Sequence, residues 1–106
     1  MITASFVIAG GNYSEFMISG HAGFSEKGTD IVCAAVSAMT NLTVNAITER
    51  FGLMAITEAD EAGAIVNFRL VERNSCACSL LQAFCEELTA LSNTYPDHIA
   101  VSVNKI

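Results

Sequence analysis

Apolar and polar residues alternate in five short stretches of the chain, which is the pattern of strands with one buried face. Gly-Gly-Asn separates the first two stretches, and an acidic turn ending in glycine separates the next two. Because such residues favour turns, we expect two antiparallel hairpins. The predicted strands are residues 2–9, 13–20, 53–58, 64–70 and, after Pro96, a final strand containing Ile99, Val101 and Val103.

Two longer stretches, residues 31–51 and about 75–93, repeat apolar residues at helical spacing. Asp30 is placed to cap the first helix, because its carboxylate can accept hydrogen bonds from first-turn amides. Gly52 is placed as the residue that follows this helix. The expected inward stripe of the first helix is Val32, Ala35, Val36, Met39, Leu42, Thr43, Ala46 and Ile47.

The resulting order ββαββαβ predicts an α/β (α+β) sandwich, in which two helices pack on a mostly antiparallel sheet. No linker or low-complexity segment divides the chain. At 106 residues it is close to the commonest domain size, so we expect a single domain spanning 1–106.

Composition narrows the functional classes. Hydrophobic residues make up 52% of the chain and the net charge is −6, with only five Lys and Arg. Scattered cations argue against nucleic-acid binding, whereas the acidic charge suits a basic partner. No apolar run approaches the roughly 20 residues of a membrane span, and no signal peptide is evident. We therefore expect a cytoplasmic protein without membrane contact, whose four cysteines remain free thiols.

Candidate chemistry is concentrated in residues 20–37. With Asp30 as the cap, Cys33 is the third residue of the helix, where free amides and the helix dipole favour a thiolate. The same amides could stabilise an oxyanion, and His21 could accept and return the thiol proton. Glycines would let the intervening loop close over a peptide, and they stand at Gly20, Gly23 and Gly28.

The residues alone leave other interpretations open. Cys33 is equally well explained as a small core residue, and a lone histidine is more often structural than catalytic. Asp30 could orient a triad, although capping explains it more simply. His98, after Pro96 and Asp97, is more typical of a surface or turn residue than of a second base. We expect no metal or cofactor, since three thiols do not converge on one helix face: Cys76, Cys78 and Cys85.

A longer motif resembles that of a known family. The sequence GHA, a glycine-containing loop and G-x-DIVCAAVSA are similar to the ribosomal-processing cysteine protease family, Prp, and the likeness extends through the ending YPDHIAV. The resemblance implies that His21 and Cys33 form a catalytic dyad. Gly20, Asp30 and Ser37 also match motif positions, which implies supporting roles.

The family resemblance also implies a substrate. Such enzymes remove a short N-terminal extension from a large-subunit ribosomal protein, number twenty-seven in the standard count. It further implies a homodimer, a loop that orders around the peptide, and a groove beside Cys33 for apolar side chains. Two alternatives remain: a binding module that assists assembly of a ribosomal protein, and a thiol redox protein, for which Cys33 lacks a C-x-x-C partner.

Overall fold

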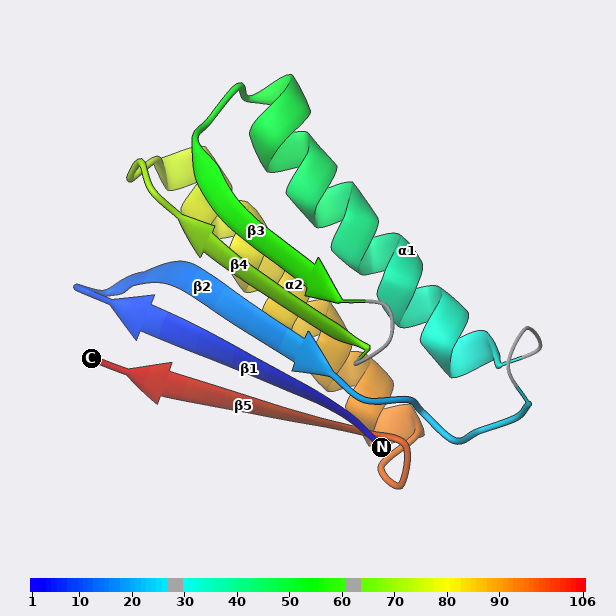
Figure 1. Ribbon diagram of the computed structural model, residues 1–106. Helices are drawn as coiled ribbons and strands as arrows, with labels where there is room; N and C mark the ends of the chain where they lie inside the picture. The colour runs from blue at the N-terminus through cyan, green and yellow to red at the C-terminus, as the bar shows by residue number, and fades with distance from the viewer. Residues whose placement is uncertain (27–29, 61–63) are drawn as a thin grey trace.

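The computed structural model consists of a layer of strands covered by a layer of helices (Figure 1). It describes residues 1–26, 30–60 and 64–106. The expected fold class and the order ββαββαβ are confirmed. The elements are β1 (Ile2–Ala9), β2 (Asn12–Ser19), α1 (Ile31–Asn45), the π-helical turn η1 (Ala46–Arg50), β3 (Ala55–Asp60), β4 (Ile65–Leu70), α2 (Ser75–Thr94) and β5 (Ile99–Lys105).

The five strands form a mixed sheet in the order β3-β4-β2-β1-β5. Antiparallel pairing joins β1 to β2, β2 to β4, and β4 to β3, in agreement with the two expected hairpins. The acidic turn between β3 and β4 extends into 61–63, outside the described residues. β5 instead runs parallel to β1, with Ile99 beside Ile2. The starts of β1 and β5 therefore meet the end of β2 at one end of the sheet (Figure 1).

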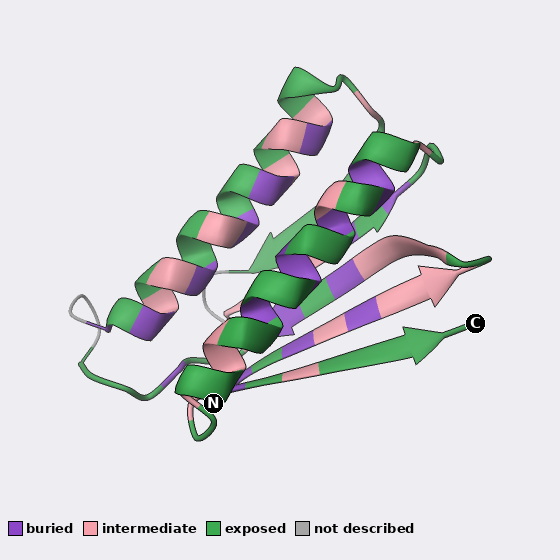
Figure 2. Ribbon diagram, turned by 180° about the vertical axis from the view of Figure 1, so that it is seen from behind, coloured by how far each residue is buried: buried purple, intermediate pink, exposed green. Residues whose placement is uncertain are grey.

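Both helices cover the same face of the sheet, and both layers carry buried residues, drawn in purple in Figure 2. The centre of the core is aromatic. Phe16 of β2 stacks on Phe68 of β4 with ring centroids 5.1 Å apart. Phe84 of α2 meets Phe6 and Phe16 edge-on, at 5.6 and 5.2 Å. These contacts fix α2 over the middle strands.

The buried face of α1 and η1 matches the expected stripe at Val32, Val36, Thr43 and Ile47, and it differs at Thr40 and Leu42. Thr40 and Thr43 are buried, and their hydroxyls donate to the carbonyls of Val36 and Met39 at 2.7 Å. Because the helix itself satisfies these hydroxyls, the two side chains can face the interior. Leu42, expected to point inward, is 71% exposed, so that expectation is wrong.

The end of the first helix also differs from the expectation of one helix over 31–51. The last turn, η1, is π-helical, and Gly52 then leaves it with a φ of 64°, as expected for a residue that ends a helix. The backbone N–H of Leu53 still bonds to the carbonyl of Ile47 at 3.1 Å. β3 therefore begins at Ala55, two residues later than expected.

Together, α1 and η1 form a 20-residue helical segment, Ile31–Arg50, that is long and apolar enough to cross a membrane by length and composition. The expectation that no run approaches this length is therefore wrong for this segment. Core packing accounts for part of its apolar character, because Val32, Val36 and Ile47 are buried in the hydrophobic core.

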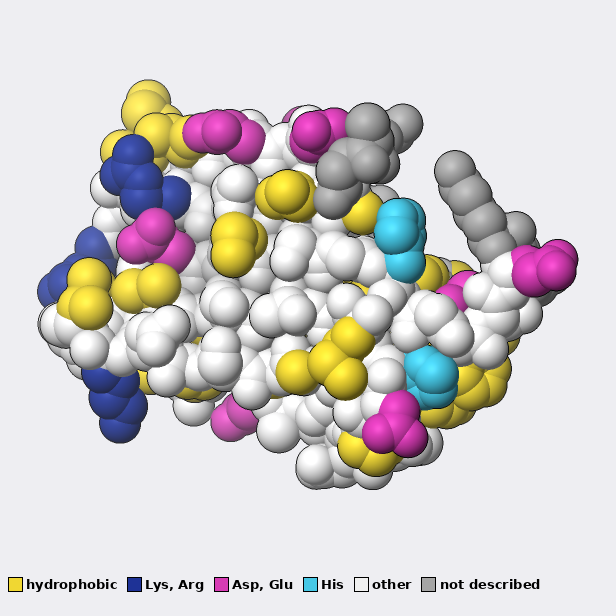
Figure 3. All heavy atoms as spheres, turned by 60° about the horizontal axis from the view of Figure 1, so that its bottom comes forward, with side chains coloured by type: hydrophobic (Ala, Val, Ile, Leu, Met, Phe, Trp, Pro, Cys, Tyr) yellow, Lys and Arg dark blue, Asp and Glu magenta, His cyan; other side chains and the backbone are white. Residues whose placement is uncertain are grey.

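Charged side chains are distributed unevenly over the face that carries both histidines (Figure 3). On this face the Lys and Arg side chains drawn in dark blue lie at one end of the molecule, whereas the histidines lie at the other. Acidic side chains lie on both sides of the histidines. Within the part of the chain that the structure describes, this end therefore presents a negative surface.

The end of β2 depends on Gly20. The strand stops at Ser19, and Gly20 follows with a φ of 91° and an N–H bonded to the carbonyl of Ala64 at 3.0 Å. A Cβ built on Gly20 would collide with the carbonyl oxygen of Met1. Only glycine fits here, and its positive φ lets the chain leave β2 and continue into the loop that begins at His21.

The start of α1 depends on the Asp30 carboxylate, which acts in two directions. Its Oδ1 accepts the N–H groups of Val32 and Cys33, both at 3.0 Å, as predicted for an N-cap. Its Oδ2 accepts the N–H groups of Phe24 and Ser25, at 3.0 and 3.3 Å, from the loop after β2. The amide of Cys33 contributes most to holding the pKa of Asp30 below its ordinary value, against an opposing effect of desolvation.

We expect Gly20→Ala to destabilise the fold by more than about 1 kcal/mol, because it adds both a strained φ and a collision with Met1. Thermal denaturation measures the loss. Gly11→Ala is the matched control, since Gly11 has a similar φ of 83° but open space around its Cβ position. Equal losses in the two variants would contradict the proposed close packing at Gly20.

We expect Asp30→Asn to lower the melting temperature at neutral pH, because a neutral amide cannot accept all four N–H groups. The folded-state pKa of Asp30 is lowered, so its contribution is fully present above the unfolded value of about 3.9. It is lost as the pH falls through the lower folded value. Melting curves at several pH values should therefore show the wild type and the variant converging in acid, whereas a constant gap would refute this origin.

Candidate active site

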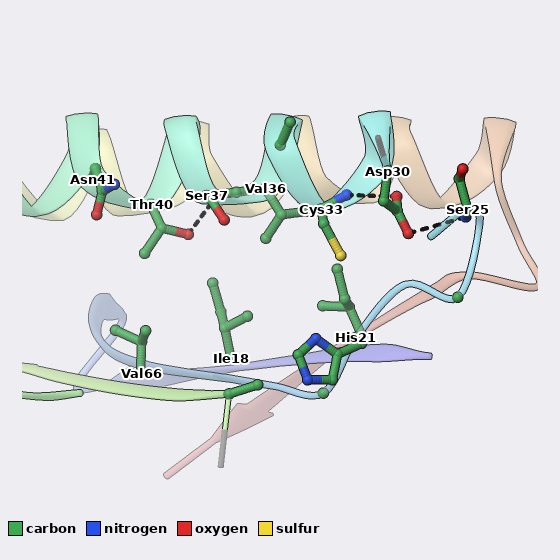
Figure 4. Close-up of a pocket in the computed structure, with 15 residues that line it drawn as sticks. Ile18, His21, Ser25, Asp30, Cys33, Val36, Ser37, Thr40, Asn41 and Val66 are labelled. Carbon is green, nitrogen blue, oxygen red and sulfur yellow. Dashed lines mark hydrogen bonds between the residues drawn. The ribbon is translucent and has the colours of Figure 1, made fainter. Parts of the chain in front are cut away.

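Cys33 lies on the first turn of α1, where the sequence placed it, and its side chain is half-buried. Its Sγ leaves the helix toward the layer of strands (Figure 4). The backbone N–H of Ala22, on the loop after β2, donates to this sulfur at 3.3 Å. A backbone amide directed at the sulfur is placed to donate to negative charge that develops there during a reaction.

His21 approaches the same space from the opposite side. It follows Gly20 and is exposed, and its imidazole lies on the wall facing Cys33 (Figure 4). Among the described residues, no hydrogen bond joins the His21 ring to the Cys33 sulfur. Catalytic hydrogen bonds are often long in the absence of substrate and tighten when it binds. The geometry is therefore that of two facing but unconnected groups.

A groove of about 660 Å³ separates α1 from the sheet and contains both groups. Side chains of α1 form one wall, whereas Ile18, His21 and Val66 form the other (Figure 4). The walls are mostly apolar and carry a few hydroxyl and amide groups, as is usual for peptide and ligand sites. The lining residues are Ile2, Ile18, Gly20, His21, Gly23, Ser25, Asp30, Cys33, Ala34, Val36, Ser37, Thr40, Asn41, Ala64 and Val66.

Most of the candidate residues named from the sequence meet at this groove. Gly20, Gly23, Asp30 and Ser37 line it together with His21 and Cys33. Ser37 is exposed and lies one helical turn beyond Cys33, on the side of α1 that lines the groove. The remaining candidate, Gly28, lies outside the described residues.

The first-turn amides do not form the expected oxyanion site. The N–H groups of Val32 and Cys33 are bonded to the Asp30 side chain, and that of Ala34 is bonded to the Asp30 carbonyl at 3.1 Å. The expectation is wrong for these three donors, because the capping carboxylate already occupies or blocks them. Asp30 acts as a cap, since these contacts of its side chain are all with backbone amides.

The loop after β2 has a further contact that the sequence did not predict, between the ring of His98 and the backbone of Ala22. The His98 Nδ1 lies 2.9 Å from the carbonyl oxygen of Ala22, the residue whose N–H meets the sulfur. His98 lies in a turn, as its place after Pro96 and Asp97 predicts, but its contact with Ala22 was not expected. The missing signal is the parallel pairing of β5 with β1, which brings His98 to the end of β2.

The other three cysteines lie on α2 and away from the groove. Cys76 is exposed, whereas Cys78 and Cys85 are buried in the core. Burial raises the pKa of the Cys85 thiol, although hydrogen bonds with Tyr13 and Thr89 oppose this effect. All four cysteines are free thiols, and in the described part of the chain no three metal-ligating side chains gather.

Comparison with known proteins identifies the family of this site. Residues 1–100 match the family model described as cysteine protease Prp. The ribosomal processing cysteine protease Prp of Bacillus subtilis is 30% identical over 96 residues, covering 86% of each chain. That of Staphylococcus aureus is 30% identical over 104 residues, covering 96% of this chain and 98% of its own.

Solved structures agree with the sequence relatives. The crystal structure of S. aureus Prp with a covalently linked product peptide has a TM-score of 0.92 at 29% identity, covering 98% of this chain and 100% of that one. A Streptococcus mutans protein has a TM-score of 0.88 at 29% identity, covering 100% and 96%. The fold and the match over residues 1–100 agree, and the chain belongs to the cysteine protease Prp family.

Proposed function

We propose that this protein is an endopeptidase that removes the N-terminal extension of a large-subunit ribosomal protein, number twenty-seven in the standard count, by a dyad of His21 and Cys33. The observation that carries this proposal is that the Cys33 sulfur and the His21 imidazole line one groove from opposite walls. The S. aureus relative, whose structure contains a covalently linked product peptide, supports a peptide as the occupant of the groove.

The proposed reaction begins with transfer of the Cys33 proton to His21. The sulfur attacks the scissile carbonyl carbon, a C–S bond forms, and the peptide C–N bond then breaks as His21 protonates the leaving amine. Water, deprotonated by His21, attacks the thioester, which releases the carboxylate and restores the thiol. His21 must therefore approach the sulfur when the peptide binds, because the two are not hydrogen-bonded in this structure.

The remaining candidates have supporting roles in this proposal. Asp30 ties the loop after His21 to the helix that carries Cys33. Gly23, with a φ of 68°, lets that loop turn. We propose that Gly23 and Gly28 together give the loop the freedom to close over a bound peptide. Ser37 offers a hydroxyl to the peptide backbone one turn along the groove wall.

The charge distribution suits a basic substrate. Acidic side chains flank the histidines, and basic ones lie at the far end of the face shown in Figure 3. Such a field attracts cationic chains, and proteins that bind ribosomal RNA are typically cationic. We place the reaction in the cytosol, where ribosomal proteins are made and thiols stay reduced.

We expect Cys33→Ala and Cys33→Ser to abolish cleavage of a peptide that spans the junction of the extension in the organism's own ribosomal protein. His21→Ala should lower the rate by about 10²–10⁴-fold, the usual contribution of a positioned acid–base group. Mass spectrometry of the products measures both the rate and the bond cleaved. Cys76→Ser is the matched control, since Cys76 is an exposed thiol outside the groove and should leave the rate unchanged.

Retention of full activity in the Cys33 variants would refute the mechanism. The alternative function, a binding module that assists assembly of a ribosomal protein, is tested by alkylating the native protein. Fast modification of Cys33, located by peptide mass spectrometry, supports the enzyme. An inert Cys33 in a folded protein that binds the peptide without cutting it supports the module.

We also propose a homodimer, as the family resemblance implies. Three exposed apolar side chains at the end of the molecule remote from His21 are compatible with a protein interface: Phe51, Met54 and Val71 are 46%, 63% and 46% exposed. Light scattering coupled to size exclusion should give twice the chain mass of 11.2 kDa. A particle of single-chain mass at micromolar concentration would contradict this assembly.

A further inference from the structure

His98 is held firmly by its own backbone, at the turn between α2 and β5. Its N–H bonds to the carbonyl of Tyr95 at 3.0 Å, and its carbonyl accepts the N–H of Ile2 at 2.9 Å. The second bond attaches the turn to the start of β1, at the end of the sheet where the parallel pairing of β1 with β5 begins. The half-buried ring of His98 therefore extends from a fixed point of the scaffold.

The ring of His98 contacts the loop after His21 in two ways. Its Nδ1 lies 2.9 Å from the carbonyl oxygen of Ala22, and a carbonyl can only accept, so Nδ1 carries the hydrogen. Its edge also meets the ring of Phe24, with centroids 5.3 Å apart. Phe24 meets Tyr95 of the same turn at 5.3 Å. One polar and two aromatic contacts thus attach the loop to the turn.

The residue held by this hydrogen bond is the one that contacts the sulfur. Ala22 is only 2% exposed, and its N–H donates to Cys33 Sγ at 3.3 Å. A hydrogen bond of this length is weakened by a small displacement of the donor. The orientation of the Ala22 N–H therefore depends on the contacts that hold Ala22 in place.

We propose that His98 is a positioning residue for the nucleophile: by holding the carbonyl of Ala22 it keeps the Ala22 N–H directed at Cys33 and so stabilises the thiolate. The proposal rests on the proposed function, because it assumes that Cys33 reacts as a thiolate. It does not require that any particular peptide is the substrate.

The chemistry of the contact distinguishes this role from simple packing. An aromatic or aliphatic side chain at position 98 would still pack against Phe24, but it would leave the Ala22 carbonyl without its donor. Asparagine offers the opposite change, because its side-chain amide can donate from a position close to that of the imidazole Nδ1. The pair His98→Phe and His98→Asn therefore separates the donor from the ring.

We expect His98→Phe to slow alkylation of Cys33 by iodoacetamide about threefold to tenfold at fixed pH, the range of one net hydrogen bond. His98→Asn should recover most of the wild-type rate. In cleavage of the junction peptide, His98→Phe should lower kcat by a similar factor and leave KM nearly unchanged, since His98 does not line the groove. Asp97→Asn, an exposed change on the same turn, should match the wild type in both assays.

All variants carry Cys76→Ser, peptide mass spectrometry locates the label, and melting curves check folding. His98→Ala replaces His98→Phe if the latter melts below the wild type. An unchanged or faster rate in a folded donorless variant would overturn the proposal, as would a His98→Asn protein as slow as His98→Phe. Alkylation of Cys33 requires no peptide, so it tests the role of His98 independently of the substrate. If the wild type does not cleave the peptide, the proposed substrate is refuted. The alkylation rates then still decide whether His98 positions the Ala22 amide.

Discussion

The carboxylate of Asp30 joins the two parts of the site, and the arrangement of the groove depends on it. One oxygen caps the helix that carries Cys33, and the other holds the loop that begins at His21. Two of these hydrogen bonds use the Val32 and Cys33 amides, which would otherwise attract an anion at the helix end. The interaction that builds the site therefore also occupies these two donors, whereas the loop amide of Ala22 is a donor at the sulfur.

Local pattern was sufficient to predict much of this fold. Helical periodicity and a capping residue located α1 and placed Cys33 on its first turn, because both depend on neighbours within a few residues. The same reasoning was right for Thr43 but failed at Leu42, which is exposed, and at Thr40, which is buried because its hydroxyl bonds to the Val36 carbonyl in the preceding turn. The five strands were found, but a periodicity of two does not say which strand lies beside which.

That limit explains what was missed in the site. His98 and Ala22 are 76 residues apart, and they meet only because β5 pairs in parallel with β1. The motif identified Cys33 and His21 as candidates, since both lie in one short stretch of the sequence. The support of the loop comes from the turn after α2 and from β5, a segment that the family likeness includes as YPDHIAV but to which no local pattern gives a role in the site.

The parallel pairing of β5 with β1 has a further consequence for synthesis of the protein. A nascent chain can form the β1–β2 hairpin and the capped α1 as soon as these segments emerge, because their contacts are local. Residues 95–105 emerge after these segments, and they supply His98 and the strand that pairs with β1. Cys33 is thus translated early, whereas the His98 contact that holds the loop beside it forms late. A chain that lacks residues 95–105 therefore lacks this support of the loop after β2.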